Sequence, residues 1–189
     1  MKKISIFASG SGSNAENIIN HFKNSQEIMV NSVVCNVADA FVLERAKRLN
    51  VHSYVITKSE LNDPDKVLKM LKELETDYIV LAGFLLLMPN NIVTAFPERI
   101  INIHPALLPA YGGKGMYGMK VHKAVIDAGE KVSGITIHFV DEKYDNGKII
   151  LQKRCDVTAT DTPESLAEKV HILEYEYYPI AIEKVILNT

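Results

Sequence analysis

Two polar side chains stand on alternate residues of an apolar segment in the sequence NIHPALLP, residues 102–109. Asn102 and His104 would share one face of a strand, because successive side chains of a strand point to opposite sides. Pro105 interrupts the hydrogen-bonding ladder, which places the pair at the end of the strand. An amide donor beside a titratable imidazole can stabilise a developing oxyanion. The alternative interpretation is a hydrogen-bonded pair within the core.

A carboxylate later in the chain could act on that imidazole. Asp145 stands in a glycine-containing turn of the sequence YDNGKIILQ, residues 144–152. A carboxylate near a histidine favours the imidazolium form and fixes the orientation of the ring. The sequence has no serine or cysteine in a G-x-S-x-G context, and no His, Cys and Asp cluster with metal-ligand spacing. The pattern therefore favours chemistry without a covalent intermediate and without a metal.

Glycines after the first apolar segment predict an anion site in the sequence SGSGSN, residues 9–14. Glycine lets the backbone approach a phosphate closely, and the start of a helix offers free N–H groups and the positive end of its dipole. Gly10, Gly12 and Ala15 also fit the dinucleotide fingerprint, but Asn36 stands where that fingerprint expects an acid. A phosphate monoester is the favoured ligand. There are two alternatives: the loop binds a dinucleotide, or it is a tight turn that binds no ligand.

Composition bounds the remaining possibilities. The chain has 189 residues, with 21 Lys and Arg against 23 Asp and Glu. A net charge of −2 gives no indication of a nucleic-acid or membrane partner. The N-terminal segment lacks the features of a signal peptide, and no apolar run approaches the roughly 18 residues of a membrane span. We expect one domain over residues 1–189, a cytoplasmic location, and Cys35 and Cys155 as apolar filler.

Apolar strands alternate with amphipathic helices along the chain. Strands are predicted at 3–9, 28–36, 52–57, 77–83, 99–105, 133–140 and 149–157. Helices are predicted at 15–22, 38–49, 63–74, 122–129 and 162–186, the last opening with a capping box at Thr162 and Ser165 and bent at Pro179. This alternation predicts an α/β protein with a doubly wound, mostly parallel, Rossmann-like sheet and helices on both faces. Ligands bind such sheets at the carboxyl ends of the strands, near the switch in strand order.

Seven segments together carry a family resemblance. In chain order they are SGSGSN, NVADAFVLERA, VLAGF, INIHPALLP, SGITIHFV, YDNGKIILQ and EYEYYP. With these segments the chain resembles the folate-dependent formyltransferases over essentially its whole length. The INIHPALLP segment, followed by the aspartate turn, is the most specific of them. The short chain and the GSGSN loop narrow the resemblance to the members that act on glycinamide ribonucleotide.

The resemblance implies a reaction and three catalytic residues. The co-substrate would be 10-formyltetrahydrofolate, and its formyl group would pass directly to the amine of glycinamide ribonucleotide in purine biosynthesis, with no metal. The resemblance implies that Asn102 and His104 stabilise the tetrahedral oxyanion. It also implies that Asp145 raises the pKa of His104 and helps to relay the proton. The implied partners are these two small molecules, with the chain a monomer or a homodimer.

The resemblance also implies binding residues. The backbone of Gly12, Ser13 and Asn14 would hold the substrate phosphate, and Glu174 would accept hydrogen bonds from the ribose hydroxyls. On pattern alone Glu174 is an exposed helix acid. The residues implied to hold the folate are Leu85, Leu86, Leu87, Met88, Asn102, Asp141, Glu142, Lys143, Tyr144 and Asp145.

Some features depart from the family pattern. Leu86 stands where relatives often have an arginine, and Pro64 stands where a basic residue is expected, so no partner for the glutamate tail of the folate is assigned. The loop at 111–122 is longer than expected, and its glycines suggest a lid. His122 and His138 are interpreted as structural. The alternative functions are another folate-dependent formyltransferase or hydrolase, an NAD-dependent dehydrogenase, and a phosphometabolite-binding module.

Overall fold

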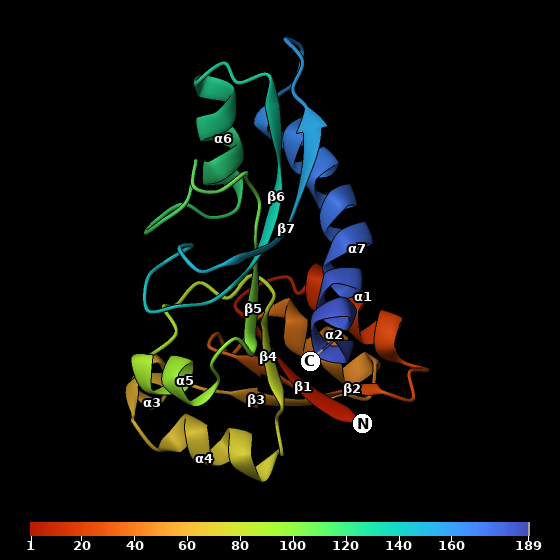
Figure 1. Cartoon of the computed structure of the whole chain (residues 1–189), viewed down its shortest axis with the longest axis vertical. Coiled ribbons are helices and arrows are strands. Elements are labelled where there is room, and N and C mark those ends of the chain that lie inside the picture. The colour runs from red at the N-terminus through yellow and green to blue at the C-terminus, as the bar shows by residue number, and fades with distance from the viewer. Residues whose placement is uncertain (189) are drawn as a thin grey trace.

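The computed structural model describes residues 1–188 and contains a seven-stranded sheet in the order β3-β2-β1-β4-β5-β6-β7 (Figure 1). The strands are β1 (Lys2–Ala8), β2 (Ile28–Cys35), β3 (His52–Val55), β4 (Tyr78–Leu81), β5 (Ile100–His104), β6 (Val132–Phe139) and β7 (Ile149–Asp156). The pairings among β3, β2, β1, β4 and β5 are parallel, whereas β6 is antiparallel to both β5 and β7. The predicted α/β, mostly parallel fold is confirmed.

Helices connect these strands and cover both faces of the sheet (Figure 1). They are α1 (Ser13–Phe22), α2 (Phe41–Arg48), α3 (Lys58–Asn62), α4 (Lys66–Glu73), α5 (Asn90–Ala95), α6 (Met119–Asp127) and α7 (Pro163–Leu187). The prediction of a single helix at 63–74 missed α3. That helix begins at a capping box between Thr57 and Glu60, and its five residues are too few to show an apolar period. The predicted capping box of Thr162 and Ser165 is confirmed at the start of α7.

The side chains of the inner strands alternate between two hydrophobic cores. Ile4 and Ile6 of β1 belong to the core formed with α1, α2, α6 and α7, whereas Phe7 belongs to the core formed with α3, α4 and α5. Val80 and Ile79 of β4 divide in the same way. This is why the inner strands read as continuous apolar runs, since a parallel strand is buried on both faces.

The strand order reverses beside β1, and this sets the place of the site. After β1 the chain goes to β2 and β3 on one side, and then crosses back to β4 on the other side. The loops that follow β1 and β4 therefore separate at their carboxyl ends, where doubly wound sheets bind ligands. The end of β5 lies next to the end of β4 at the same edge.

One buried tyrosine joins helix α7 to the sheet by hydrogen bonds, in addition to the apolar packing of the helix in the core. The hydroxyl of the fully buried Tyr178 donates to the carbonyl oxygens of Leu81, at 2.9 Å, and of Ile101, at 3.1 Å. Glu174 lies one turn earlier on the same helix, so this anchor also sets the position of Glu174 relative to the ends of β4 and β5.

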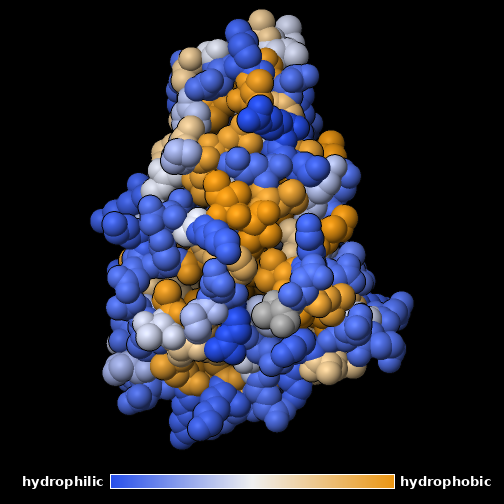
Figure 2. All heavy atoms as spheres, viewed as in Figure 1, coloured by the Kyte–Doolittle hydropathy of each residue, from blue (hydrophilic) through white to orange (hydrophobic). Residues whose placement is uncertain are grey.

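On the face shown in Figure 2, apolar residues gather around the middle of the molecule and polar residues surround them. None of the helices described is both long enough and apolar enough to cross a membrane.

Candidate active site

A cavity of about 650 Å³ opens at the carboxyl ends of β1, β4 and β5. Its wall takes in the β1–α1 loop, the segment after β4, the end of β5, the loops before α6 and after β6, and part of α7. Every predicted site residue lies on this wall except Asp141 and Glu142. Asp141 instead accepts hydrogen bonds from the Lys143 amide and the Asn146 side chain, so it shapes the turn that carries Asp145.

The β1–α1 loop has the geometry of an anion site. Gly12 is the N-cap of α1 and has φ of +75°, a conformation that favours glycine. A Cβ at Gly12 would lie 2.8 Å from the Cα of Val42, so no larger side chain fits there. The Val42 amide donates to the carbonyl of Gly10, and Arg45 Nε donates to the carbonyl of Ser11. The loop is therefore held from behind by α2, with its open side toward the cavity.

The charges behind that loop are already paired. Both Arg45 and Arg48 form ion pairs with Glu16, in the first turn of α1. The attraction for an anion at this point therefore comes mainly from the backbone N–H groups and the helix N-terminus.

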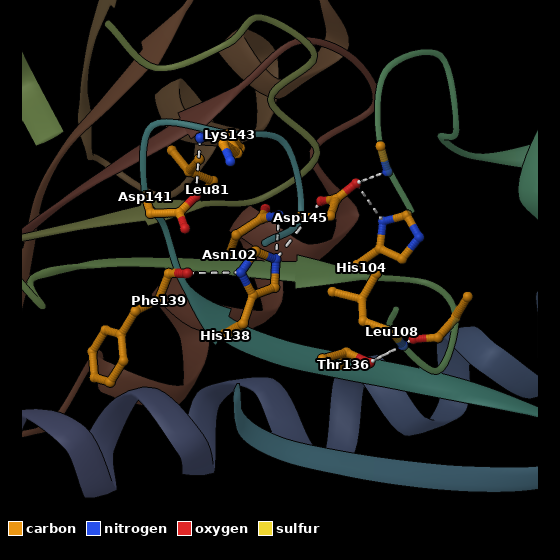
Figure 3. Close-up of polar contacts among 12 residues, drawn as sticks. Leu81, Asn102, His104, Leu108, Thr136, His138, Phe139, Asp141, Lys143 and Asp145 are labelled. Carbon is orange, nitrogen blue, oxygen red and sulfur yellow. Dashed lines mark hydrogen bonds and ion pairs between the residues drawn. The ribbon is translucent and has the colours of Figure 1, made fainter. Parts of the chain in front are cut away.

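Asn102 and His138 form a pair across two neighbouring strands. They stand opposite one another in the antiparallel register of β5 and β6. His138 Nδ1 lies 2.8 Å from the carbonyl oxygen of Phe139, a contact that requires a proton on Nδ1. In the neutral ring Nε2 then accepts from the Asn102 amide at 3.1 Å. Figure 3 draws this contact as a dashed line. This bond orients the Asn102 amide and uses only one of its two N–H groups.

His104 lies between a carbonyl and a carboxylate. Its Nε2 is 2.7 Å from the carbonyl oxygen of Tyr111. Its Nδ1 is 3.5 Å from Oδ2 of Asp145, and Figure 3 draws this ion pair as a dashed line. The short contact with Tyr111 requires a proton on Nε2, because two lone pairs would repel at that distance. Nδ1 is therefore the nitrogen that gains and loses a proton, and a proton placed there faces the charge of Asp145.

Burial affects the pKa of His104 more strongly than Asp145 does. Burial lowers the pKa of His104 below 6.5, and it outweighs the opposing effects of Asp145 and of the Tyr111 carbonyl. Asp145 does act upward on this pKa, as expected, but the net shift is downward. The imidazole is therefore neutral near pH 7, with Nδ1 free to take a proton.

Asp145 is held by groups from three segments. Its Oδ2 accepts the Gly113 N–H at 2.9 Å, and its Oδ1 lies 3.7 Å from His138 Nε2. Burial acts to raise the pKa of Asp145, but the side chains of His138 and His104 and the Gly113 amide together lower it. The carboxylate is therefore charged at neutral pH. Its backbone has φ of +51°, in the left-handed region that aspartate and asparagine tolerate better than most residues.

Glu174 is buried, not exposed as its sequence pattern alone indicated. It is 5% exposed and lines the cavity. One of its oxygens, Oε2, receives the Asn14 side-chain amide and contacts His171 Nδ1, both at 2.8 Å. The hydrogen bond to Glu174 raises the pKa of His171. Asn14 thereby connects the anion loop to the carboxylate that the resemblance assigns to the ribose.

The segment after β4 presents apolar side chains. Leu85 and Leu87 are 47% and 40% exposed, whereas Met88 is buried in the core with α3, α4 and α5. Leu85, Leu86, Leu87 and Met88 all line the cavity, so the wall here suits a flat, weakly polar ring.

Sequence reasoning missed three residues at this site. His138, interpreted as structural, contacts both Asn102 and Asp145. His122 lines the cavity, is 3% exposed, and has an Nδ1 with no hydrogen-bond partner in the part of the chain described. Lys114, in the long loop before α6, lines the cavity as well. The sequence does indicate that His138 could lie near Asn102, because its strand is the next apolar strand along the chain. It does not give the register between the two strands, which decides whether the two side chains meet.

The residues described, 1–188, contain no group of three or more His, Cys, Asp or Glu side chains arranged to hold a metal ion. Cys35 and Cys155 are both free thiols, Cys35 buried and Cys155 partly so.

Comparisons with known proteins show the family to which the chain is related. A family model described as "Formyl transferase" matches residues 2–182. Phosphoribosylglycinamide formyltransferase of Bacillus subtilis is 35% identical over 191 residues, which cover 98% of this chain and 95% of that protein. The chloroplastic enzyme of that name from Arabidopsis thaliana is 42% identical over 186 residues, 94% of this chain. The chain spans 63% of the length of the Arabidopsis thaliana enzyme. It spans 60% of the length of the chloroplastic enzyme of the same name from Vigna unguiculata.

Solved structures agree as well. Glycinamide ribonucleotide transformylase 1 from Symbiobacterium toebii superposes with a TM-score of 0.90 at 33% identity, covering 100% of this chain and 89% of that one. The protein of the same name from Geobacillus kaustophilus gives a TM-score of 0.89 at 34% identity, covering 98% and 99%.

Proposed function

The chain belongs to the formyl transferase family, and from that membership and its site we propose that it is a phosphoribosylglycinamide formyltransferase. It transfers the formyl group of 10-formyltetrahydrofolate to the primary amine of glycinamide ribonucleotide, a step of purine biosynthesis. The observation that carries the proposal is the convergence of Asn102, His104 and Asp145 on one cavity that also holds the β1–α1 anion loop.

The two substrates occupy opposite parts of the cavity. The substrate phosphate lies against the N–H groups of Gly12, Ser13 and Asn14, and the ribose hydroxyls donate to Glu174. The pterin lies against the apolar segment 85–88, with Lys143, Tyr144 and Asp145 on its other side. The reacting amine and the formyl carbon then meet at the end of β5, beside Asn102 and His104.

The chemistry is a direct acyl transfer. The amine lone pair attacks the formyl carbon, and the carbonyl π electrons move to the oxygen to form a tetrahedral oxyanion. The free N–H of Asn102 stabilises that oxyanion. Collapse of the intermediate re-forms the carbonyl and breaks the bond to N10 of the folate, which leaves as tetrahydrofolate after it takes a proton.

One proton must move from the attacking amine to N10. His104 Nδ1 is unprotonated in the free protein and faces Asp145, so it can hold this proton while the carboxylate stabilises the imidazolium. His104 then passes the proton to N10 as the bond between N10 and the formyl carbon breaks. No covalent enzyme intermediate and no metal enter these steps.

A turnover assay tests the function. The purified chain is mixed with 10-formyltetrahydrofolate and glycinamide ribonucleotide, and tetrahydrofolate is followed by its ultraviolet absorbance. The expected result is tetrahydrofolate formation that depends on glycinamide ribonucleotide, matched by formylated product in a mass spectrum. Release of formate without the ribonucleotide would instead identify a hydrolase. Binding of NADH, detected by its fluorescence and without turnover of the folate, would favour the dehydrogenase alternative.

A further inference from the structure

The hydroxyl of Ser9 connects three strand ends beneath the cavity. Ser9 follows β1 directly, is 7% exposed, and is not itself on the cavity wall. Its Oγ donates to Oδ1 of Asn36, just after β2, at 2.6 Å. The same Oγ accepts the amide N–H of Leu85, beyond β4, at 2.9 Å. A single buried hydroxyl therefore acts as donor on one side and as acceptor on the other.

The segment 85–88 depends on this hydroxyl more than the anion loop does. Within residues 1–188, the bond from Leu85 to Ser9 is the one hydrogen bond shown for the backbone of 85–88. Leu85 and Leu87 are also 47% and 40% exposed, so packing holds these two residues of the segment only weakly. The anion loop, by contrast, keeps its bonds from Val42 and Arg45 of α2 whether or not Ser9 has a hydroxyl.

We propose that Ser9 is a positioning residue for the folate, which holds the backbone of 85–88 in the shape that receives the pterin ring. The inference rests on the proposed function and deepens it, because it assigns different supporting contacts to the two substrate sites. Ser9 supports the folate site, and residues of α2 support the phosphate site. Asn36 completes the arrangement, since its side-chain oxygen takes the hydroxyl proton and turns the oxygen lone pairs of Ser9 toward Leu85. Removal of the hydroxyl leaves the Leu85 amide without its partner and loosens the segment.

Calorimetric titrations of Ser9→Ala and of the unmodified chain test this inference. Each protein is titrated separately with tetrahydrofolate and with glycinamide ribonucleotide. Ser9→Ala should bind tetrahydrofolate about tenfold more weakly, as expected for the loss of one hydrogen bond to a partly buried amide. Its affinity for glycinamide ribonucleotide should stay within about twofold, because the loop bonds from α2 remain.

Ser133→Ala is the matched control, and Ser9→Cys keeps the test valid if Ser9→Ala does not fold. Ser133 lies on β6, is 2% exposed, and its hydroxyl has no hydrogen-bond partner in the described chain, so its loss should change neither affinity. Cysteine is close to serine in size but a weak acceptor, so Ser9→Cys should also lose tetrahydrofolate affinity selectively. Melting temperatures of all variants report on general destabilisation.

The outcomes separate the two proposals. Equal loss of both ligands in Ser9→Ala, or unchanged tetrahydrofolate binding, would overturn the role of Ser9 while leaving the proposed function in place. If the unmodified chain binds neither ligand, the proposed function falls, and the role of Ser9 falls with it.

Discussion

Replacement of Asp145 by asparagine removes one charge from the site and little else. Asparagine has nearly the same size, tolerates the positive φ of this position, and can still accept the Gly113 N–H. We therefore expect Asp145→Asn to fold and to bind both substrates. What disappears is the attraction between the carboxylate and a proton on His104 Nδ1.

The distance sets the size of the effect. Unit charges 3.5 Å apart attract by about 5 kcal/mol at an effective dielectric constant of about 20. Each charge is spread over two atoms, and the new amide still forms a hydrogen bond, so we take about half of this, roughly 2–3 kcal/mol. That energy corresponds to a decrease in kcat of about 30- to 150-fold. Because His104 is neutral in the free protein and takes its proton during the reaction, the loss should fall on kcat and not on substrate binding.

Steady-state kinetics and histidine NMR measure this together. The His104 resonance, assigned by its absence in His104→Ala, should titrate at lower pH in Asp145→Asn than in the unmodified chain. Asp127→Asn is the control, since it removes one carboxylate charge from the exposed surface of α6, off the cavity wall. An unchanged His104 titration together with lost activity would refute the electrostatic argument and leave Asp145 acting on substrate or water. Normal activity would remove Asp145 from the mechanism.

Three further predictions concern other parts of the site. His104→Ala should keep both dissociation constants within a few-fold but lower kcat by about 10² or more, and a variant with most of its kcat intact would make His104 structural. Gly12→Val should weaken glycinamide ribonucleotide far more than tetrahydrofolate in calorimetric titrations, because its φ and the contact with Val42 exclude a side chain, and equal losses would contradict the anion loop. The pKa of His171 is raised in the folded state, so its stabilising effect is complete below about 6.5 and is lost as the pH rises through that raised pKa. His171→Gln should therefore reduce the free energy of unfolding in denaturant titrations at about pH 5.5 but not at about pH 9, and a deficit that grows with pH would contradict the pairing with Glu174.

The sequence by itself determined the class of fold and placed the two residues proposed as catalytic, Asn102 and His104, on one face of a strand. The alternation of apolar runs with amphipathic segments leads to a doubly wound sheet. An apolar run is a strand that must be covered on both faces, and an amphipathic segment is a helix that can cover one of those faces. Asn102 and His104 share a face because the period of a strand is two, and this holds whatever surrounds the strand. Gly12 could be placed at the start of a helix for a similarly local reason. Local periodicity failed at α3, whose five residues contain too little of the period to detect.

Only the tertiary structure decided which distant residues come into contact and which protonation state the site histidine His104 has. His138 joins the site because the β5–β6 register sets it opposite Asn102, and no local pattern contains that register. Ser9 bonds Leu85 because β1 and β4, 70 residues apart in sequence, are neighbours in the sheet. The pKa of His104 depends on how completely the assembled chain removes water from the ring. Burial is a property of all the elements together, so the downward shift could be known only once they were in place.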